Sequence, residues 1–173
     1  MQHLPSAVSS SLGIRQAQDL TPYLDPNTPN ASKIMEILLR LERETLAPYT
    51  APGNIISMNM YDDLPLPWTI PTAVTAFPKS SYVKHEYDRN GVLSNGVSFF
   101  GGGRESSLDD VERGFSTASM VTRWREAHPD LVGTDKDVVK AFVNELREAL
   151  PADQQRVQQG SATAILLFKK TKN

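Results

Sequence analysis

The stretch 117-TASMVTRWREAHPDLVGTDKD-137 carries the pattern that decides the fold. Its first part contains three apolar residues at spacings that bring them to one face of a helix. We therefore expect a helix over residues 116–127, and the His-Pro pair at 128–129 predicts that it ends there in a turn. The residues expected on the apolar face are Met120, Val121 and Trp124.

The end of the same stretch begins a second helix, expected over residues 135–149. Thr134 and, three residues later, Asp137 are typical of a helix start, where side-chain oxygens accept hydrogen bonds from free backbone N–H groups. The apolar residues of this helix recur at helical spacing and are expected to face the core. They are Val138, Val139, Phe142, Val143, Leu146 and Leu150.

An earlier helix is expected over residues 31–47. Asn30 can cap its first turn, and Pro48 ends it because proline lacks a backbone donor. Its apolar stripe consists of Ile34, Ile37, Leu38 and Leu41. Residues 1–29 are polar and rich in turns, so we interpret them as an N-terminal arm. Residues 30–173 then form the single domain that this length allows.

A glycine-rich stretch, 99-FFGGGRESS-107, is expected to form a flexible loop. Its spacing matches neither dinucleotide nor phosphate-binding motifs. Arg104 within it can still reach an anion. Ser107 with Asp110 predicts the start of a further helix, which Gly114 is expected to end or kink.

Two stretches predict strands that form a small antiparallel sheet. Residues 81–88 alternate between two faces before the turn at Asn90-Gly91, although a short helix is an alternative for this stretch. Residues 161–169 contain the apolar run 165–168 and predict the clearest strand of the chain. The chain is therefore expected to have an α+β fold, with helices packed on this sheet.

The segment between the first helix and the first strand, residues 48–80, is rich in proline and predicts an extended, structured loop. Four apolar and aromatic side chains are expected to anchor it to the domain. They are Tyr61, Leu64, Leu66 and Trp68.

Composition excludes several classes of function. The net charge is -2, which gives no general attraction to nucleic acid or to an anionic membrane. The chain has no cysteine, so disulfides, thiolate catalysis and cysteine metal sites are excluded. No apolar run approaches membrane-spanning length, and the first residues do not resemble a secretory signal. We therefore expect a cytoplasmic protein.

The two arginines beside Trp124 are candidates for holding a ligand carboxylate. Arg123 and Arg125 lie about 200° apart around a helix, so they do not form a clamp, and at most one faces a given ligand. The alternative is a buried tryptophan flanked by two solvated arginines that pair with Glu126 or Asp130.

The three histidines, His3, His85 and His128, have no carboxylate or second histidine at a metal-binding spacing, so no metal site is expected. His85 is the best candidate for a general base because it lies among charged residues on an expected strand. Tyr82 and Lys84 are the other residues expected to move protons. The alternative is a strand-edge histidine without a chemical role.

Five stretches in this order resemble a known family. They are LAPYTAPGN (46–54), MYDDLPLPW (60–68), TAFPKSSYVKHEYDRNG (75–91), STASMVTRWREAHPDLVGTDKDVV (116–139) and GSATAILLFKK (160–170). Together they are similar to the C-terminal half of fungal class I methyltransferases that use S-adenosylmethionine, a group that includes trans-aconitate methyltransferases. The resemblance covers roughly residues 28–170.

The resemblance implies a substrate-side domain without its cofactor half. The family forms a doubly wound sheet and binds its cofactor in the N-terminal half, at a glycine-rich turn after an early strand. Here the glycine cluster, 101–103, comes late, so no cofactor site is expected. The fold would be a truncated class I methyltransferase-like remnant. Because a two-stranded sheet is marginal in water, we expect completion by homodimerisation or by pairing with a fuller methyltransferase.

Three functions follow as alternatives. The first is a methyltransferase-family homologue that binds a small carboxylate-bearing metabolite without a donor site. The second is a donor-free decarboxylase, isomerase or cyclase of fungal secondary metabolism, with His85, Tyr82 and Lys84 as catalytic residues. The third is a non-catalytic partner subunit that covers a sheet edge. The residues expected to bind substrate are Arg123, Arg125, Trp124, Arg104, Trp68 and Tyr61.

Overall fold

The computed structural model describes residues 29–171, so the N-terminal arm expected over 1–29 lies, except for its last residue, outside the described residues. The described part is α+β, as expected. Its α-helices are α1 (Ala31–Arg40), α2 (Pro52–Met58), α3 (Leu108–Ser116), α4 (Ser119–Ala127) and α5 (Val138–Ala149). Its strands are β1 (Val83–Tyr87), β2 (Arg104–Ser107), β3 (Arg156–Gln159) and β4 (Thr163–Leu167). Short helical turns cover Leu41–Thr45, Ala47–Tyr49, Lys79–Ser81 and Arg89–Gly91.

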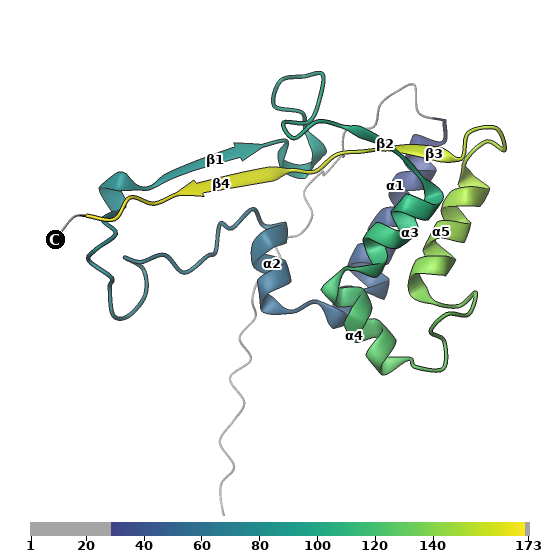
Figure 1. Cartoon of the computed structure of the whole chain (residues 1–173), viewed down its shortest axis with the longest axis horizontal. Helices are drawn as coiled ribbons and strands as arrows, with labels where there is room; N and C mark the ends of the chain where they lie inside the picture. Colours follow the sequence, from purple (N-terminus) through teal and green to yellow (C-terminus); the bar gives the residue numbers. More distant parts are fainter. Residues whose placement is uncertain (1–28, 172–173) are drawn as a thin grey trace, which may run out of the picture.

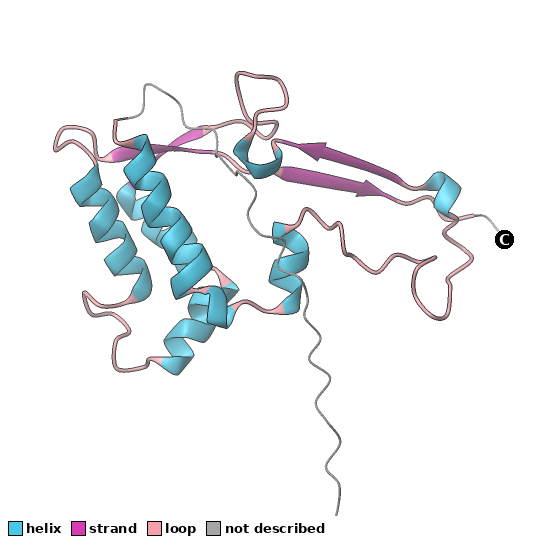
Figure 2. Ribbon diagram, turned by 180° about the vertical axis from the view of Figure 1, so that it is seen from behind, coloured by secondary structure: helices cyan, strands magenta, loops and turns pink. Residues whose placement is uncertain are grey.

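The described elements form two parts of different character (Figure 1). The first, here called the helical body, contains α1, α3, α4 and α5, with β2 and β3 across one end. The second, here called the extension, contains β1 and β4, the segment 60–82 and the C-terminal residues 168–171. Figure 2 shows from behind that the two long strands project away from the helices, with the C-terminus at the far end.

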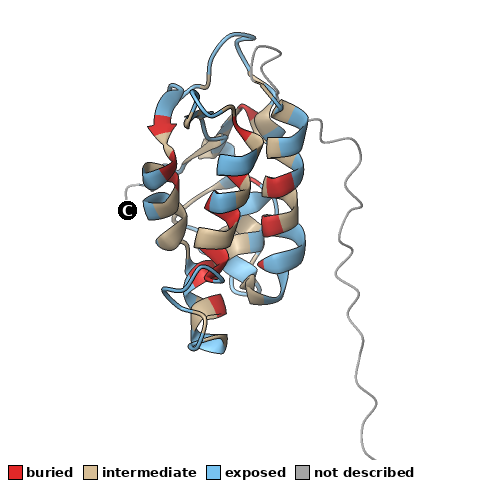
Figure 3. Cartoon of the chain, turned by 90° about the vertical axis from the view of Figure 1, so that its right-hand side faces the viewer, coloured by how far each residue is buried: buried red, intermediate tan, exposed pale blue. Residues whose placement is uncertain are grey.

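The apolar core lies in the helical body. Its members are at most 7% exposed, and α5 supplies five of them, in agreement with the stripe expected over residues 135–149. The cluster consists of Ile37, Leu41, Leu46, Leu108, Val111, Val121, Trp124, Val138, Val139, Phe142, Val143, Leu146 and Leu150. Figure 3 shows the buried positions along the inward faces of the helices. Burial of each such side chain contributes about 1.5 to 3 kcal/mol, so these helices hold most of the stability.

The helix starts differ in two places from the sequence-based expectation. Asn30 has the left-handed backbone (φ 55°) and makes no side-chain cap; its Nδ2 instead donates to the Ala149 carbonyl, 2.7 Å away. The last helix begins at Val138, where the Asp137 carboxylate accepts the Val139 N–H at 3.0 Å. Asp137 is therefore the cap, and Thr134 lies in the preceding turn, where its hydroxyl accepts the Lys136 N–H instead.

The middle helices confirm one expected cap and correct two boundaries. Ser107 and Asp110 bind each other's backbone N–H groups at 3.2 Å, as their spacing predicted. Gly114 does not end α3, which continues to Ser116. The helix expected from residue 116 begins instead at Ser119.

Both sheets of the described chain have two antiparallel strands. The expected pair, β1 and β4, is confirmed, with His85 opposite Ile165. The second pair, β2 and β3, was not predicted, because their sequences RESS and RVQQ lack an apolar run. The stretch 99–107 is thus a loop that ends in a strand. Val157 of β3 packs against the apolar core of the body, which explains why so polar a pair is retained there.

Candidate functional site

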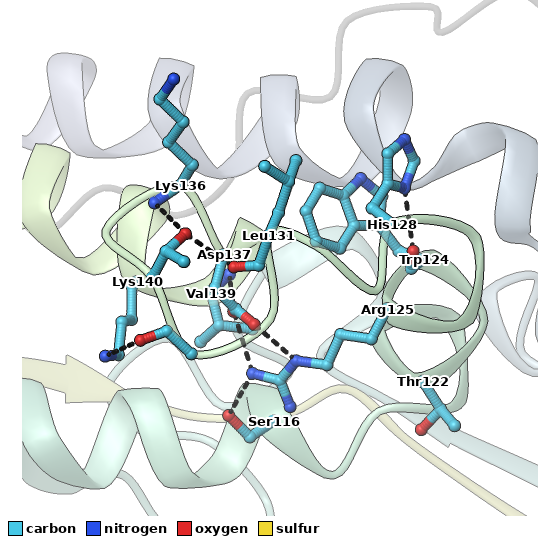
Figure 4. A network of polar contacts seen from close by, with 12 residues as sticks. Ser116, Thr122, Trp124, Arg125, His128, Leu131, Lys136, Asp137, Val139 and Lys140 are labelled. Atoms are coloured by element: carbon cyan, nitrogen blue, oxygen red, sulfur yellow. Dashed lines mark hydrogen bonds and ion pairs between the residues drawn. The ribbon is translucent and has the colours of Figure 1, made fainter.

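Arg125 forms a two-point ion pair with a buried carboxylate (Figure 4). Its Nε donates to Asp137 Oδ2 at 2.8 Å and its Nη2 to Asp137 Oδ1 at 2.9 Å, while Nη2 also lies 3.3 Å from Ser116 Oγ. The partner is thus Asp137, 1% exposed, and not Glu126 or Asp130 as the sequence suggested. This pair ties α4 to the start of α5.

The pKa of Asp137 shows how strong this arrangement is. Burial alone would raise the pKa of this carboxyl group, but hydrogen bonds from the Arg125 guanidinium and the Val139 N–H outweigh burial and hold the pKa below its usual value. Asp137 therefore stays ionised at neutral pH, and the charge of Arg125 is matched inside the protein.

Arg123 is also bound to its own chain. Its Nε donates to the Tyr49 carbonyl and its Nη2 to Asn54 Oδ1, both at 2.6 Å. Asn54 Oδ1 in turn accepts the Ala51 N–H at 3.0 Å, at the start of α2, and Asn54 Nδ2 donates to Ser119 Oγ at 3.1 Å. Arg123 thus fastens α2 to α4, and neither α4 arginine is a solvated side chain.

Trp124 is a core residue of the body. Its indole stacks on the His128 ring with centroids 4.4 Å apart, and Tyr49 meets the same ring edge-on at 5.9 Å. His128 Nδ1 lies 2.9 Å from the Trp124 carbonyl oxygen, which can only accept, so Nδ1 carries the proton. The face expected to present Trp124 to a ligand is therefore packed inside the protein.

Lys84 lies in a four-charge network on one face of the extension. Its Nζ is 2.7 Å from Asp62 Oδ1 and 2.5 Å from Glu86 Oε1, and Arg89 Nη2 reaches the same two oxygens at 3.0 and 2.5 Å. Burial would lower the pKa of Lys84, but hydrogen bonds to Asp62 and Glu86 outweigh burial and raise it. Lys84 therefore stays protonated at neutral pH and is held by two carboxylates in this network.

His85 points to the opposite face of β1 from Lys84, as strand alternation requires. It is exposed, its ring lies 6.5 Å from that of Tyr87, and within residues 29–171 its side chain makes no hydrogen bond. Tyr82 belongs to an aromatic cluster, with ring centroids 5.1 Å from both Trp68 and Phe168. The three residues expected to move protons therefore do not converge on one point.

The remaining expected residues lie apart from these groups. Arg104 begins β2, and its side chain is exposed and makes no hydrogen bond or ion pair within the described chain. Tyr61 is half-exposed and has a left-handed backbone (φ 63°) in the turn after α2. Figure 1 shows α4 at the base of the body, β2 at its other end and β1 in the extension, so the expected site residues are not brought together.

A shallow depression does lie between α1 and α5, with a volume of about 580 Å³. It contains none of the residues that the sequence suggested for a site. Its lining consists of Asn30, Lys33, Ile37, Arg40, Glu145, Glu148 and Ala149. Two of these residues, Arg40 and Glu145, form an ion pair with each other.

Sequence reasoning missed Asp88, which organises the loop after β1. Asp88 is 1% exposed; its carboxylate accepts the Ser94 N–H at 2.7 Å and the Phe100 N–H at 2.5 Å. These backbone hydrogen bonds lower the pKa of Asp88. Phe100 is thereby held over Tyr87, with ring centroids 3.8 Å apart. The only sequence signal was the turn pair that follows Asp88.

The β1–β4 sheet exposes both a face and an edge. On what we call the open face, Val83 is 43% exposed and its cross-strand neighbour Leu167 is 50% exposed. The other face carries Lys84, Leu166 and the aromatic cluster. Within residues 29–171, no backbone group from outside the ladder hydrogen-bonds to residues 163–167. Among the described residues, the outer edge of β4 is thus a row of backbone groups without backbone partners.

No family model, no curated protein and no solved structure matches this chain. The similarity to methyltransferases therefore stays a prediction. Within the described residues, no three histidine, aspartate or glutamate side chains are grouped in a way that could hold a metal ion. The helices of the described part are also too short or too polar to cross a membrane.

Proposed function

We propose that this chain is a protein-interaction module that binds an uncharged strand of a partner protein at the outer edge of β4. One observation carries the proposal. The strand 163-TAILL-167 is uncharged, lies outside the apolar core, and has an outer edge without backbone partners in the described chain. Such edges are templates for strand addition, and natural proteins usually protect them.

Charged side chains, which protect the edges of natural sheets, are present on β1 and missing from β4. β1 contains Lys84, His85 and Glu86 within its five residues, and charged side chains on an edge strand discourage pairing. The 12 residues from Val157 to Phe168, which include β4, contain no charge. The first charged residues after this stretch are Lys169 and Lys170. The two edges of the same sheet therefore differ in how they favour an added strand.

The residues considered for catalysis and for substrate binding are compatible with this function. Arg123 and Arg125 hold the helices together, and Lys84 is fixed as a charged group. A reaction centre requires an acid, a base and a binding group within reach of one substrate. The expected residues, Lys84 and His85 of β1, Arg104 of β2, and Arg123 and Arg125 of α4, lie in different elements.

Strand addition also defines the chemistry of the partner. Backbone hydrogen bonds supply affinity, and alternate side chains meet those of Thr163, Ile165 and Leu167 on the open face. A charge on the added strand would lose water beside Ile165 or Leu166 without gaining an ionic partner. The partner strand is therefore uncharged.

A synthetic strand tests this proposal directly. A fluorescein-labelled peptide, acetyl-STVTVTVTKK-amide, is titrated with the full chain and followed by fluorescence polarisation. Saturable binding is expected, together with slower amide hydrogen exchange in residues 163–167 and unchanged exchange in α5. The control peptide is N-methylated at its three valines, which removes backbone donors and is expected to abolish binding.

Two results of that titration would contradict the proposal. The first is polarisation that does not saturate, or that saturates equally with the N-methylated peptide. The second is protection that appears in the helical body and not in β4, because the peptide would then bind another surface.

Binding of a small carboxylic acid, as in the methyltransferase resemblance, is a second candidate. The observation that favours it is Arg104, an exposed guanidinium without a partner in the described chain, next to the glycine cluster. Calorimetric titration with S-adenosylmethionine and with trans-aconitate tests it. Heat with either ligand, lost in Arg104→Gln but kept in the exposed control Arg113→Gln, would support it, and no heat with either would eliminate it.

A further inference from the structure

We infer that the strand added to β4 is β4 of a second copy of this chain, in an antiparallel register centred on Ile165. The two copies then form a continuous four-stranded sheet in the order β1, β4, β4 of the partner, β1 of the partner. This inference rests on the proposed interaction at the β4 edge and specifies the partner.

The first step is the self-complementarity of β4. In a register centred on Ile165, Thr163 lies opposite Leu167 of the partner subunit, and Ala164 lies opposite Leu166 of the partner subunit. All five strand residues are then paired, and every pair is uncharged. The same patch serves both copies, which is the arrangement that a two-fold dimer requires.

The second step is the direction of pairing, which the lysines decide. A parallel, in-register pair would place Lys169 and Lys170 beside their own copies, about 5 Å apart, where like charges repel. In the antiparallel register Lys169 lies opposite the partner's Ser161 and Lys170 opposite the partner's Gly160. The two Lys169 residues are then eight positions, or about 27 Å, apart along the strands, beyond the screening length of about 8 Å.

The third step is the orientation of the two faces. Directly opposite residues share one face of a sheet, and a register centred on Ile165 pairs odd-numbered residues with odd-numbered ones. The open faces of both copies therefore lie on the same side. A shift of the register by one residue would place the open face of one copy on the same side of the sheet as the opposite face of the other copy. That opposite face carries Lys84 and its acidic partners.

The fourth step is why assembly stops at two copies. The outer strand on each side of the four-stranded sheet is β1, whose charged residues oppose further pairing. The two-fold contact pairs the outer edge of each β4 with the other copy. No β4 edge is therefore left free to add a third chain and extend the assembly into a fibre. The sheet also grows from two strands to four, above the size at which sheets become stable in water.

The absence of cysteine allows a clean cross-linking test on the full chain. Two variants, Thr163→Cys and Leu167→Cys, are oxidised separately and as a mixture. In the inferred register each cysteine lies four positions, about 14 Å, from its own copy, too far for a disulfide. In the mixture, residue 163 of one chain lies opposite residue 167 of the other, within disulfide range. A cross-linked dimer of 38.2 kDa, twice 19.1 kDa, is expected only in the mixture.

Val97→Cys serves as the control for random collision, because Val97 is 80% exposed on the loop after β1 and lies outside the inferred interface. A mixture of Val97→Cys with Leu167→Cys is expected to give less than one tenth of the cross-linked product. Light scattering of the unmodified chain over a concentration series is expected to show the mass rising from 19.1 to 38.2 kDa.

The outcomes separate this inference from the proposed function. A chain that stays monomeric while it binds the valine–threonine peptide would overturn the second copy as partner and leave strand addition standing. A monomer that binds no peptide would overturn both. Cross-linking of each variant alone would indicate a parallel pair and overturn the register. A monomer whose β4 amides are already protected would also overturn the inference, because residues 1–28 of the same chain would then be the occupant to test.

Discussion

The helical body and the extension are built on opposite principles. Thirteen buried apolar side chains form the core of the body, and none of them lies in the extension. The extension is held by a four-charge network, a cluster of three aromatic rings and one antiparallel ladder. The body thus has its own apolar core, and no residue of β1 or β4 belongs to that core.

Burial of apolar surface gives the body its stability, whereas the extension has an exposed face and edge, on which the proposed strand addition depends. The chain offers a natural reporter for each part, because its two tryptophans are Trp124 in the body and Trp68 in the extension. Single-tryptophan variants, Trp68→Phe and Trp124→Phe, therefore follow the unfolding of each part separately.

The largest effect is expected from Phe142→Ala. Phe142 is buried in α5 and packs against Phe115 with ring centroids 4.9 Å apart. Its removal leaves a cavity and is expected to lower the free energy of unfolding by about 3 to 5 kcal/mol in urea titrations followed through Trp124.

The matched control for that change is Phe168→Ala in the extension. Phe168 is half-exposed, and its removal is expected to lower the stability measured through Trp124 by less than about 1 kcal/mol. Equal losses from the two phenylalanines would show that the chain folds as one cooperative unit, and the contrast between the parts would not hold.

The second largest effect is expected from Arg125→Gln, which leaves the buried Asp137 carboxylate without its ionic partner. An unpaired buried charge is strongly destabilising, and we expect a loss of about 2 to 3 kcal/mol because Arg125 is itself partly exposed. Thermal unfolding followed by circular dichroism measures it. Arg113→Gln is the matched control, since the Arg113–Asp110 pair is exposed and contributes less than about 0.5 kcal/mol. A loss in Arg125→Gln no larger than in this control would argue against a structural role for the pair.

The sequence predicted the helical body well because apolar periodicity is a local signal. The stripes ending at Leu41 and Leu150 became buried faces, and the strand run at 165–168 found its partner in β1. The Ser107–Asp110 cap was also readable, because both of its residues lie within one turn of the chain.

The candidate site was not predictable in the same way, because each of its side chains is placed by a partner far along the sequence. Arg123 meets Tyr49, 74 residues away, and Lys84 meets Asp62, 22 residues away. A single sequence shows that these residues are charged but not which charge is already matched. The polar pair β2–β3 was missed for a related reason: its pairing depends on the helices beneath it and not on its own composition.

A smaller and local effect is expected from Trp68→Ala in the extension. Trp68 anchors the proline-rich segment against Tyr82 and Phe168, with ring centroids 5.1 and 6.3 Å away. Each aromatic contact contributes about 0.5 to 1.5 kcal/mol. We expect amide hydrogen exchange in β1 and β4 to become at least tenfold faster while exchange in α5 is unchanged. Trp68→Phe keeps an aromatic ring and is expected to retain most of the protection; faster exchange in α5 would contradict the separation of the two parts.

The smallest effect is a pH-dependent release of the loop after β1, which depends on Asp88. Hydrogen bonds from the Ser94 and Phe100 N–H groups lower the pKa of this carboxyl group in the folded chain below its usual 3.8. Asp88 therefore binds a proton more readily when the loop is released than when it is folded. Its stabilisation of the loop is complete above about pH 4 and is lost as the pH falls through the lowered pKa. NMR is expected to show the Phe100 amide shifting in that acidic range while α5 amides stay in place.

Asp88→Asn, whose side-chain amide offers only one acceptor oxygen for the two N–H groups, is expected to release Phe100 already at neutral pH and to remove the acid transition. An acid transition that persists in Asp88→Asn would assign the loop's pH dependence to another carboxylate and leave Asp88 with a purely geometric role.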